Sequence, residues 1–358
     1  MGKRRVLLLG SGKIGAMITE MLAGSGDYAV TVADRDEAAL RRLARDGVEL
    51  RPLDVTDQAA LIETVRGHDA VMSACPYTLT PVIAEAAKAG GAHYFDLTED
   101  VESTRRVKQL AEGSPTAFVP QCGLAPGFIS IAAYDLARRF DDLRDVHMRV
   151  GALPLYPTNA LKYNLTWSTD GLINEYCNPC EAIVDGHLRE VMALEGDEAF
   201  ALDGVTYEAF NTSGGLGTLC ETLQGRVRNL DYKTVRYPGH RDIVRMLVQD
   251  LRLGERREIL KDVLEAAVPA TNQDVVLIFV SVSGTRDGRL MQESFAKKVY
   301  SRDIGGRVWS AIQVTTAAGI CTMVDLLLDG RLPDHGFVRQ EQAALSDFLD
   351  NRFGRHYA

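Results

Sequence analysis

The stretch Arg5–Gly15, RVLLLGSGKIG, constrains the fold of this 358-residue chain more than any other. Its run of Val and Leu is typical of a strand that is covered on both faces, as in parallel sheets. The G-x-G-x-x-G pattern that follows places a tight turn at Gly10, an open backbone at Gly12 and close helix–strand packing at Gly15. Free N–H groups at the start of the next helix, near Lys13, can then bind phosphates.

An acidic residue stands at the distance that this turn requires for a dinucleotide. The expected second strand, 28–33, ends in Asp34, close to the ~20-residue offset at which a carboxylate meets the ribose hydroxyls. The alternative, a turn of the same shape that binds no nucleotide, would not need this carboxylate. The negative charge of Asp34 disfavours a 2′-phosphate, so NAD is favoured as the cofactor, and the adjacent Arg35 leaves NADP as the alternative.

Strands and helices alternate regularly up to about residue 120. We expect strands at 5–9, 28–33, 48–53, 70–74, 94–96 and 116–119, with helices at 58–66, 81–89 and 102–111 between them. This alternation predicts the α/β class, a Rossmann-type doubly wound parallel sheet. Ligands of such sheets lie beyond the carboxyl ends of the strands. The predicted cofactor contacts are Gly10, Ser11, Gly12, Lys13, Ile14, Gly15, Asp34, Arg35, Asp54, Cys75, Pro76 and Tyr77. The same rim argument assigns Asp96 and Glu99 to the substrate.

The pattern changes after Gly127, where longer and mixed elements begin. We expect a helix at 129–139, strands at 145–150, 275–282 and 295–300, and a long apolar helix at 309–328. The chain is therefore divided into a dinucleotide-binding domain (1–124), an inserted α+β substrate and dimerisation domain (125–305) and a helical return to the first domain (306–345). The tail after 341 is interpreted as a surface helix.

Composition excludes several classes of partner. The net charge of −9 argues against a nucleic acid or an anionic membrane surface. No signal peptide is recognised, and no apolar run is expected to approach the ~20 residues that cross a bilayer. The six cysteines are scattered, as is typical of reduced cytoplasmic thiols. Cys177 and Cys180 have the spacing of half a zinc site, but no second pair stands nearby, so no metal is predicted.

Three segments could carry chemistry, and each has a structural alternative. The loop 122–127 is either a rigid hinge or a nicotinamide-facing loop. In 162–168 the alternation of polar and apolar residues suggests a strand, whose Tyr163 and Trp167 belong either to the core or to a pocket. Arg236 suits the bidentate binding of a carboxylate, and His240 suits proton transfer, although a lone histidine is more often a satisfied structural residue.

Several motifs occur together in a familiar order. The chain carries GSGKIG at 10–15, CGLAPG at 122–127, GALP at 151–154, KYNLTWS at 162–168, a segment from Glu175 to Gly186, and RYPGH at 236–240. In these motifs it resembles the saccharopine dehydrogenase-like family, and within that family the lysine 6-dehydrogenases most closely. Ala125 stands where glutamate-forming saccharopine reductases usually carry an Asp, which favours the lysine 6-dehydrogenase group.

The resemblance implies roles for particular residues. Tyr163, Thr166 and Trp167 are expected in the substrate pocket, Arg236 as the carboxylate clamp, and His240 as the base with Tyr163 orienting the substrate. We therefore expect an NAD(P)-dependent oxidoreductase acting on CH–NH2 or CH–NH groups, in particular one that deaminates L-lysine at the ε-carbon. The alternatives are a saccharopine-type enzyme that oxidises a secondary amine and a non-catalytic NAD-sensing protein. The family also implies a homo-oligomer, a dimer or larger.

Overall fold

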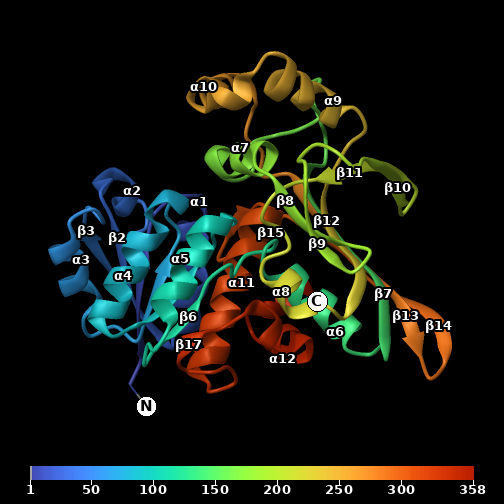
Figure 1. Ribbon diagram of the computed structural model, residues 1–358. Coiled ribbons are helices and arrows are strands. Elements are labelled where there is room, and N and C mark those ends of the chain that lie inside the picture. The colour runs from blue at the N-terminus through green and yellow to red at the C-terminus, as the bar shows by residue number, and fades with distance from the viewer. Residues whose placement is uncertain (1) are drawn as a thin grey trace. The chain divides into compact units, whose positions relative to one another are not determined.

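The computed structural model describes residues 2–358 (Figure 1). These residues divide into two compact units. The first unit contains the described residues up to Phe128, together with Gly305–Arg307 and Gln313–Ala358. The second unit contains Ile129–Ile304 and Val308–Ile312. The sequence had placed the corresponding boundaries at 124/125 and 305/306.

The strands of the first unit form one parallel sheet. They are β1 (Arg4–Leu9), β2 (Tyr28–Asp34), β3 (Val48–Pro52), β4 (Ala70–Ser73), β5 (His93–Asp96), β6 (Ala117–Val119) and β17 (Gly336–Phe337). Within the described residues the sheet has seven strands in the order β17-β6-β5-β4-β1-β2-β3. Every pairing is parallel, and the order reverses at β1, next to β4. This confirms the predicted doubly wound sheet.

Helices connect these strands, and side chains at their first residues explain where several begin. The helices are α1 (Lys13–Ser25), α2 (Glu37–Arg41), α3 (Gln58–Val65), the 3-10 turn η1 (Tyr77–Leu79), α4 (Thr80–Gly90) and α5 (Val101–Ala111). Asp36, Asp57 and Asp100 accept hydrogen bonds from the first free backbone N–H groups of α2, α3 and α5. The core beneath the helices is formed by apolar residues of the strands, including Leu7 and Val71.

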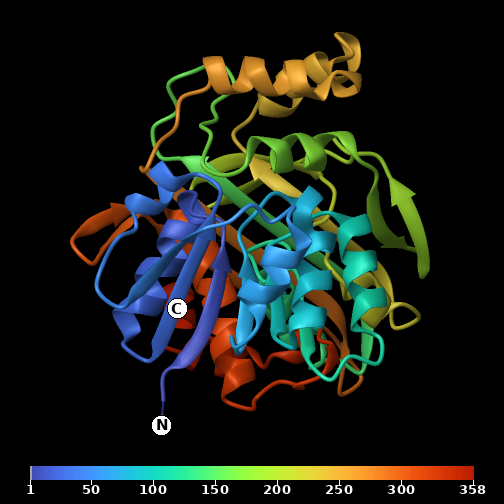
Figure 2. The ribbon, with the colours of Figure 1, turned by 90° about the vertical axis from the view of Figure 1, so that its left-hand side faces the viewer.

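The C-terminal segment completes the first unit. It contains most of α11 (Ala311–Leu328), followed by η4 (Gln340–Gln342), α12 (Leu345–Asp350) and η5 (Gly354–Tyr357). Both views show the red α11 beside the blue and cyan strands (Figures 1 and 2). By length and composition α11, the long apolar helix expected at 309–328, could cross a membrane, but 89% of it is buried inside the structure, as in a core helix.

The tail is not the surface helix that the sequence suggested. Phe348 on α12 is fully buried, and so is Tyr357 on η5. The ring of Tyr357 stacks on Phe128 with 4.0 Å between centroids, and Phe348 packs on the same ring at 5.1 Å. The surface interpretation was wrong because these aromatic residues find an apolar partner that is distant in sequence.

The second unit contains a mixed sheet. Its strands are β7 (Asp142–Pro154), β8 (Cys180–Val184), β9 (His187–Val191), β10 (Glu198–Leu202), β11 (Val205–Asn211), β12 (Val227–Arg236), β13 (Asp274–Arg286) and β14 (Arg289–Tyr300). The short strands β15 (Arg302–Ile304) and β16 (Arg307–Trp309) pair with each other. In the described chain the main path runs β10-β11-β12-β7-β13-β14, with β12 and β7 parallel and the other pairs of this path antiparallel.

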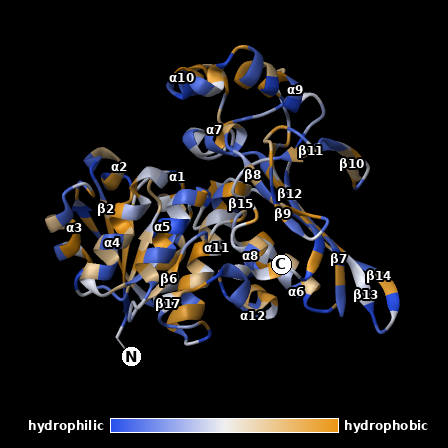
Figure 3. Cartoon of the chain, in the orientation of Figure 1, coloured by the Kyte–Doolittle hydropathy of each residue, from blue (hydrophilic) through white to orange (hydrophobic). Residues whose placement is uncertain are grey.

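Helices accompany the strands of the second unit. They are α6 (Phe128–Ala137), α7 (Thr169–Cys177), α8 (Leu219–Leu223), α9 (His240–Arg245), the π-helix η2 (Met246–Asp250), η3 (Leu253–Glu255) and α10 (Arg257–Ala267). Figure 1 shows α7, α9 and α10 gathered at the same end of the strands. Helix α10 is amphipathic, as its mixed colours in Figure 3 show, and it buries Leu260 and Leu264.

The segment 162–168 is not the strand that its alternation suggested. It runs without helix or strand pairing until Ser168 caps α7. Residues 163–166 are all buried, whichever way their side chains point. The alternation therefore does not separate a core face from a solvent face.

Candidate functional site

The turn after β1 has the backbone that a phosphate-binding loop needs. Gly10 has a φ of +103°, and a Cβ there would lie 2.9 Å from the carbonyl oxygen of Ala74. A Cβ at Gly15 would lie 1.9 Å from the carbonyl oxygen of Gly10, so only glycine fits. At Gly12, in contrast, a Cβ would meet no atom within 4 Å, and no side chain caps the first turn of α1. Open space and free N–H groups therefore coincide where a pyrophosphate would bind.

Asp34 is fixed at the end of β2 by the same turn. Its Oδ2 accepts hydrogen bonds of 2.7 Å from both the backbone N–H and the hydroxyl of Ser11. Its Oδ1 accepts from the N–H of Asp36 at 3.0 Å. Partial burial opposes the charge, but these hydrogen bonds outweigh it and hold the pKa of Asp34 below its usual value. The carboxylate is thus ionised and oriented beside the glycine turn, where it suits ribose hydroxyls.

The other predicted cofactor residues lie around the same ends of the strands. Asp54, after β3, accepts hydrogen bonds from Thr56, and its charge interacts with that of Arg35. Cys75 follows β4; desolvation and the charge of Asp34 raise the pKa of its thiol to about 12, so it stays protonated. Pro76 is exposed and precedes η1, which begins at the half-buried Tyr77.

Asp96 and Glu99 lie in different environments at the end of β5. Asp96 is 1% exposed, and its Oδ1 accepts hydrogen bonds from the N–H groups of Thr98 and Gln121. Burial raises the pKa of Asp96 to about 6, although these hydrogen bonds oppose the shift. This carboxyl group therefore joins two loops of the first unit. Glu99 is half-buried in the loop that precedes α5.

The CGLAPG loop at 122–127 is closely packed within the first unit. A Cβ at Gly127 would lie 2.1 Å from the carbonyl oxygen of Gly123. A Cβ on Gly319 of α11 would lie 2.5 Å from the carbonyl oxygen of Cys122. The Gln340 amide also donates hydrogen bonds to the Pro120 carbonyl at 2.7 Å and to Cys122 Sγ at 3.2 Å. These contacts make the loop rigid, and burial keeps the Cys122 thiol protonated by raising its pKa.

Four predicted site residues of the second unit, Tyr163, Trp167, Arg236 and His240, lie close together. Tyr176, which was not predicted, joins them, and we call these five residues the Arg236 cluster. Arg236, the last residue of β12, is 3% exposed. Its guanidinium carbon lies 4.9 Å from the centre of the Tyr163 ring and 5.9 Å from that of Tyr176. The Trp167 indole donates to the Tyr163 hydroxyl at 3.2 Å. The structure therefore brings together four side chains from three separate segments of the sequence.

Hydrogen bonds connect the polar members of this cluster. Arg236 Nε donates to the Tyr176 hydroxyl at 3.0 Å, and its Nη1 donates to the Val235 carbonyl at 2.8 Å. The Tyr176 hydroxyl lies 3.0 Å from His240 Nε2, and His240 Nδ1 lies 2.8 Å from the Leu161 carbonyl. His240 is therefore held on both ring nitrogens.

Burial and neighbouring charges together determine the charge states in the cluster. It opposes the charge of Arg236, but the surrounding Tyr176, Tyr163 and Glu175 outweigh it and raise the pKa of Arg236 above its usual value. Burial and the positive charge of Arg236 lower the pKa of His240 to about 3. At neutral pH the cluster thus holds a guanidinium and a neutral imidazole.

Hydroxyl and amide oxygens near this cluster are buried without a hydrogen-bond partner. They are Asn164 Oδ1 and Thr212 Oγ1, whereas the Thr166 hydroxyl interacts with that of Tyr163. The Asn164 amide nitrogen already donates to the Pro269 carbonyl at 3.0 Å, so flipping the amide would not satisfy its oxygen. Buried polar atoms normally have partners, so these oxygens can accept hydrogen bonds from a bound molecule.

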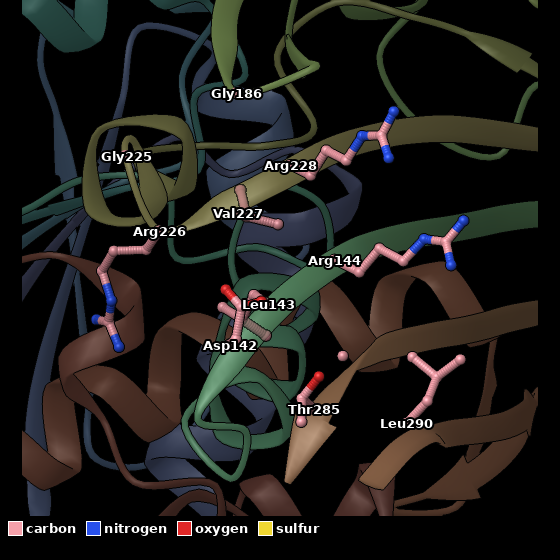
Figure 4. A pocket seen from close by; sticks show the side chains of 11 residues that line it. Asp142, Leu143, Arg144, Gly186, Gly225, Arg226, Val227, Arg228, Thr285 and Leu290 are labelled. Atoms are coloured by element: carbon pink, nitrogen blue, oxygen red, sulfur yellow. The ribbon is translucent and has the colours of Figure 1, made fainter. Parts of the chain in front are cut away.

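The open pocket in Figure 4 is less suited to a ligand. Its volume is about 610 Å3, at one end of the second unit's sheet. Arg144 and Arg228 point the same way while Arg226 points away from them, so the three do not converge (Figure 4). Among residues 2–358 no group of three or more His, Cys, Asp or Glu side chains could hold a metal ion. Cys177 and Cys180 are free thiols.

The doubly wound sheet and the glycine turn define a dinucleotide-binding α/β protein with a second, mixed-sheet unit. Residues 6–118 match the family model of the saccharopine dehydrogenase NADP binding domain, and residues 123–353 match that of the saccharopine dehydrogenase C-terminal domain. The chain belongs to the saccharopine dehydrogenase family. The predicted family and the NAD(P)-binding domain are thus confirmed.

Individual proteins that are similar to this chain are saccharopine dehydrogenases. Saccharopine dehydrogenase [NADP(+), L-glutamate-forming] of Pyricularia oryzae is 26% identical over 309 residues, which cover 78% of this chain and 67% of that protein. The Saccharomyces cerevisiae enzyme of the same name is 29% identical over 198 residues, covering 53% of this chain and 44% of its own length. A solved apo saccharopine dehydrogenase (L-Glu forming) from S. cerevisiae has a TM-score of 0.77 at 19% identity, covering 98% of both chains, which shows a shared fold.

The position of Tyr176 beside Arg236 and His240 was not predicted from the sequence. The segment from Glu175 to Gly186 carried the family resemblance but no assigned role. Tyr176 lies on α7 and contacts residues more than fifty positions later, so no local spacing pairs it with His240. Its place on a short, mostly buried helix directly after KYNLTWS was the available signal.

Proposed function

We propose that this protein is an NAD(P)-dependent oxidoreductase that oxidises a carbon–nitrogen bond of an amino acid, most specifically L-lysine at its ε-carbon. The observation that carries the proposal is the Arg236 cluster, a buried guanidinium near hydroxyl and amide oxygens without partners, in a chain that also has a dinucleotide turn. A guanidinium suits the carboxylate that every amino acid carries. Ala125 supports the lysine reaction over the saccharopine reaction.

Amine oxidation removes a hydride from carbon and a proton from nitrogen, and water then hydrolyses the imine to an aldehyde and ammonia. A bound nicotinamide dinucleotide supplies the hydride acceptor. Arg236 would bind the α-carboxylate, Thr166 and Trp167 would line the pocket, and Tyr163 would orient the substrate. The sequence predicted that His240 is the base that accepts the proton from the substrate nitrogen.

The residues of the first unit support NAD over NADP. Asp34 is ionised and held by Ser11, and Asp54 adds a second carboxylate near Arg35. Two negative charges at this end repel a 2′-phosphate, although the curated relatives are named for NADP(+). We expect Asp34→Ala to shift the ratio of kcat/KM values toward NADP by about tenfold or more, since one charge–charge contact is removed.

The alternative with support of its own is oxidation of saccharopine, a secondary amine, because the relatives carry that name. Absorbance at 340 nm with NAD or NADP and L-lysine, saccharopine or other amino acids separates the two. Reduction with L-lysine supports the proposal. Reduction with saccharopine alone supports the alternative, and cofactor binding without reduction by any amine indicates a non-catalytic sensor.

A matched control variant should prevent cofactor binding without disturbing the hydrophobic core. Gly12→Val places a side chain in the open space beside the glycine turn, where no protein atom lies within 4 Å of the Cβ. The variant should melt near the wild-type temperature and should not bind NAD. Amine-dependent reduction that persists in this variant would contradict the assigned cofactor turn.

A further inference from the structure

The hydrogen-bond chain that ends at His240 determines where its protons lie. The Leu161 carbonyl can only accept, so the 2.8 Å contact places a proton on Nδ1. In the neutral ring Nε2 then accepts, and the 3.0 Å contact with Tyr176 is a hydroxyl that donates to Nε2. The Tyr176 oxygen accepts in turn from Arg236 Nε at 3.0 Å. Each bond thus has a defined donor and acceptor.

This arrangement is unsuited to proton abstraction by His240. Its one unprotonated nitrogen faces the Tyr176 hydroxyl rather than open space. Protonation would place an imidazolium beside the guanidinium of Arg236, with both cations buried. Burial and the charge of Arg236 lower the pKa of His240 to about 3, far below the neutral range in which a general base works best.

We propose that His240 is a positioning residue, which acts through Tyr176 to hold the guanidinium of Arg236 in the orientation that binds the substrate carboxylate. The inference rests on the proposed function of the Arg236 cluster. Nε2 fixes the direction of the Tyr176 proton, so the lone pair of that hydroxyl points at Arg236 Nε. Without this acceptor the hydroxyl is free to rotate, and Arg236 loses the bond that sets its plane.

The other contacts of Arg236 explain why its hydrogen bond to Tyr176 affects the orientation of the guanidinium. The rings of Tyr163 and Tyr176 confine the guanidinium, and the Val235 carbonyl accepts from Nη1 at 2.8 Å. The Nε bond to Tyr176 is the second hydrogen bond that restricts rotation about the end of the side chain. Bidentate binding of a carboxylate needs a fixed plane, so the affinity for substrate depends on this bond.

Two amide substitutions separate positioning from proton transfer. In His240→Gln the amide oxygen can reach the position of Nε2 and accept from Tyr176. In His240→Asn the amide nitrogen can reach the position of Nδ1 and donate to the Leu161 carbonyl, but Tyr176 loses its acceptor. Neither amide can take up a proton, so both would fail as a base.

We expect His240→Asn and Tyr176→Phe to raise the KM for the amino acid about 10- to 100-fold, the value of one hydrogen bond to a charged group. Their kcat should stay within about threefold of wild type, and His240→Gln should retain a near-normal KM. Tyr207→Phe, on β11 outside the cluster, is the matched control and should change neither constant. Loss of about 10²-fold or more in kcat for both amide variants, with KM unchanged, would show that His240 is the base.

The tautomer provides a readout that does not depend on turnover. In the whole protein, 15N NMR of the His240 ring should show a protonated Nδ1 and an unprotonated Nε2 from pH 5 to 8. The titratable groups around the ring are Arg236, Tyr163 and Tyr176, with Glu175 near Arg236. Titration of the ring in this range, or an Nε2–H tautomer, would overturn the inference. A wild-type protein that oxidises no amine would instead refute the proposed function, whatever tautomer is found.

Discussion

Two arginines on neighbouring strands of the second unit are almost equally buried but are paired differently. The side chain of Arg149, on β7, is 5% exposed and forms ion pairs with Glu198 and Asp231. Arg236, on β12, is 3% exposed, and its hydrogen bonds go to the neutral oxygens of Tyr176 and Val235. One guanidinium is surrounded by carboxylates, whereas the other is held mainly by neutral groups.

The two arginines also lie on opposite faces of the sheet. Lys233 pairs in register with Arg149, and successive residues of a strand alternate between faces, so Arg236 lies on the other face of β12. The face of Arg149 carries a ladder of ion pairs, in which Lys233 also binds Glu198 at 2.6 Å. We conclude that Arg149 stabilises the fold, while the positive charge of Arg236 can bind an anion.

The largest expected effect is on stability, at Arg149. Arg149→Met should lower the free energy of unfolding by about 3 kcal/mol, because Glu198 and Asp231 lose their buried partner. Urea unfolding measures this loss. Arg144→Met, which removes an exposed side chain that lies 3.5 Å from Asp145, is the control and should cost less than about 0.5 kcal/mol. A similar loss of stability in both variants would show that the buried ion pairs of Arg149 contribute no more than an exposed ion pair does.

The next effect is on substrate binding, at Arg236. Arg236→Lys keeps the charge but loses the Nε bond to Tyr176 and the planar fork, so the KM for the amino acid should rise about tenfold or more. Arg149→Lys makes the same chemical change at the other site and should leave KM unaltered. Steady-state kinetics and the dissociation constant for NAD, expected to be unchanged, provide the measurement. An unchanged KM for Arg236→Lys would contradict the carboxylate clamp.

The ion pair between Asp231 and Arg149 should make the stability of the protein depend on pH in the acid range. Burial opposes the charge of Asp231, but the hydrogen bond from His147 and the charge of Arg149 outweigh it and lower its pKa. Because the folded-state pKa lies below the unfolded value of about 4, this carboxylate stabilises the protein above that pH. The contribution disappears as pH falls further. Melting temperatures measured from pH 6 down to pH 2 should fall less steeply below about pH 4 in Arg149→Met than in wild type, and parallel curves would contradict this assignment.

The smallest effect is expected at Lys233. Among the ion pairs described, its ammonium group contacts only Glu198, through Oε2, and that glutamate side chain is 36% exposed. Lys233→Met should therefore cost about 0.5–1 kcal/mol in urea unfolding and should leave KM unchanged. A cost as large as that of Arg149→Met would show that the ladder acts as a single unit.

The first unit could be predicted largely from the sequence because its signals are local. A buried strand, three glycines and an acid at the expected offset specify the turn, and the structure reproduces β1, α1 and β2 within one residue of the expected starts. Steric need also explains Gly15, whose Cβ would overlap the Gly10 carbonyl. The glycine turn can be predicted because its residues interact with residues that are close in the sequence.

The Arg236 cluster could not be predicted in this way. Tyr176, Arg236 and His240 meet through a helix, a strand end and a turn, and their partners include the Leu161 carbonyl, which has no side-chain signature. Alternation in 162–168 suggested a strand, but its polar and apolar side chains are both buried at 163–166, so the pattern does not mark a solvent face. The motif RYPGH located Arg236 and His240, but only the fold shows that Tyr176 joins them.

The first unit includes a C-terminal segment, and this affects the order in which the protein can fold during synthesis. Phe128 receives its aromatic neighbours from Phe348 and Tyr357, and β17 reaches the edge strand β6 only at Gly336. During synthesis the N-terminal strands therefore leave the ribosome long before the residues that cover their edge. The second unit has all its strands earlier, so it can fold first, while the nucleotide unit stays exposed to aggregation or chaperones until translation reaches η5.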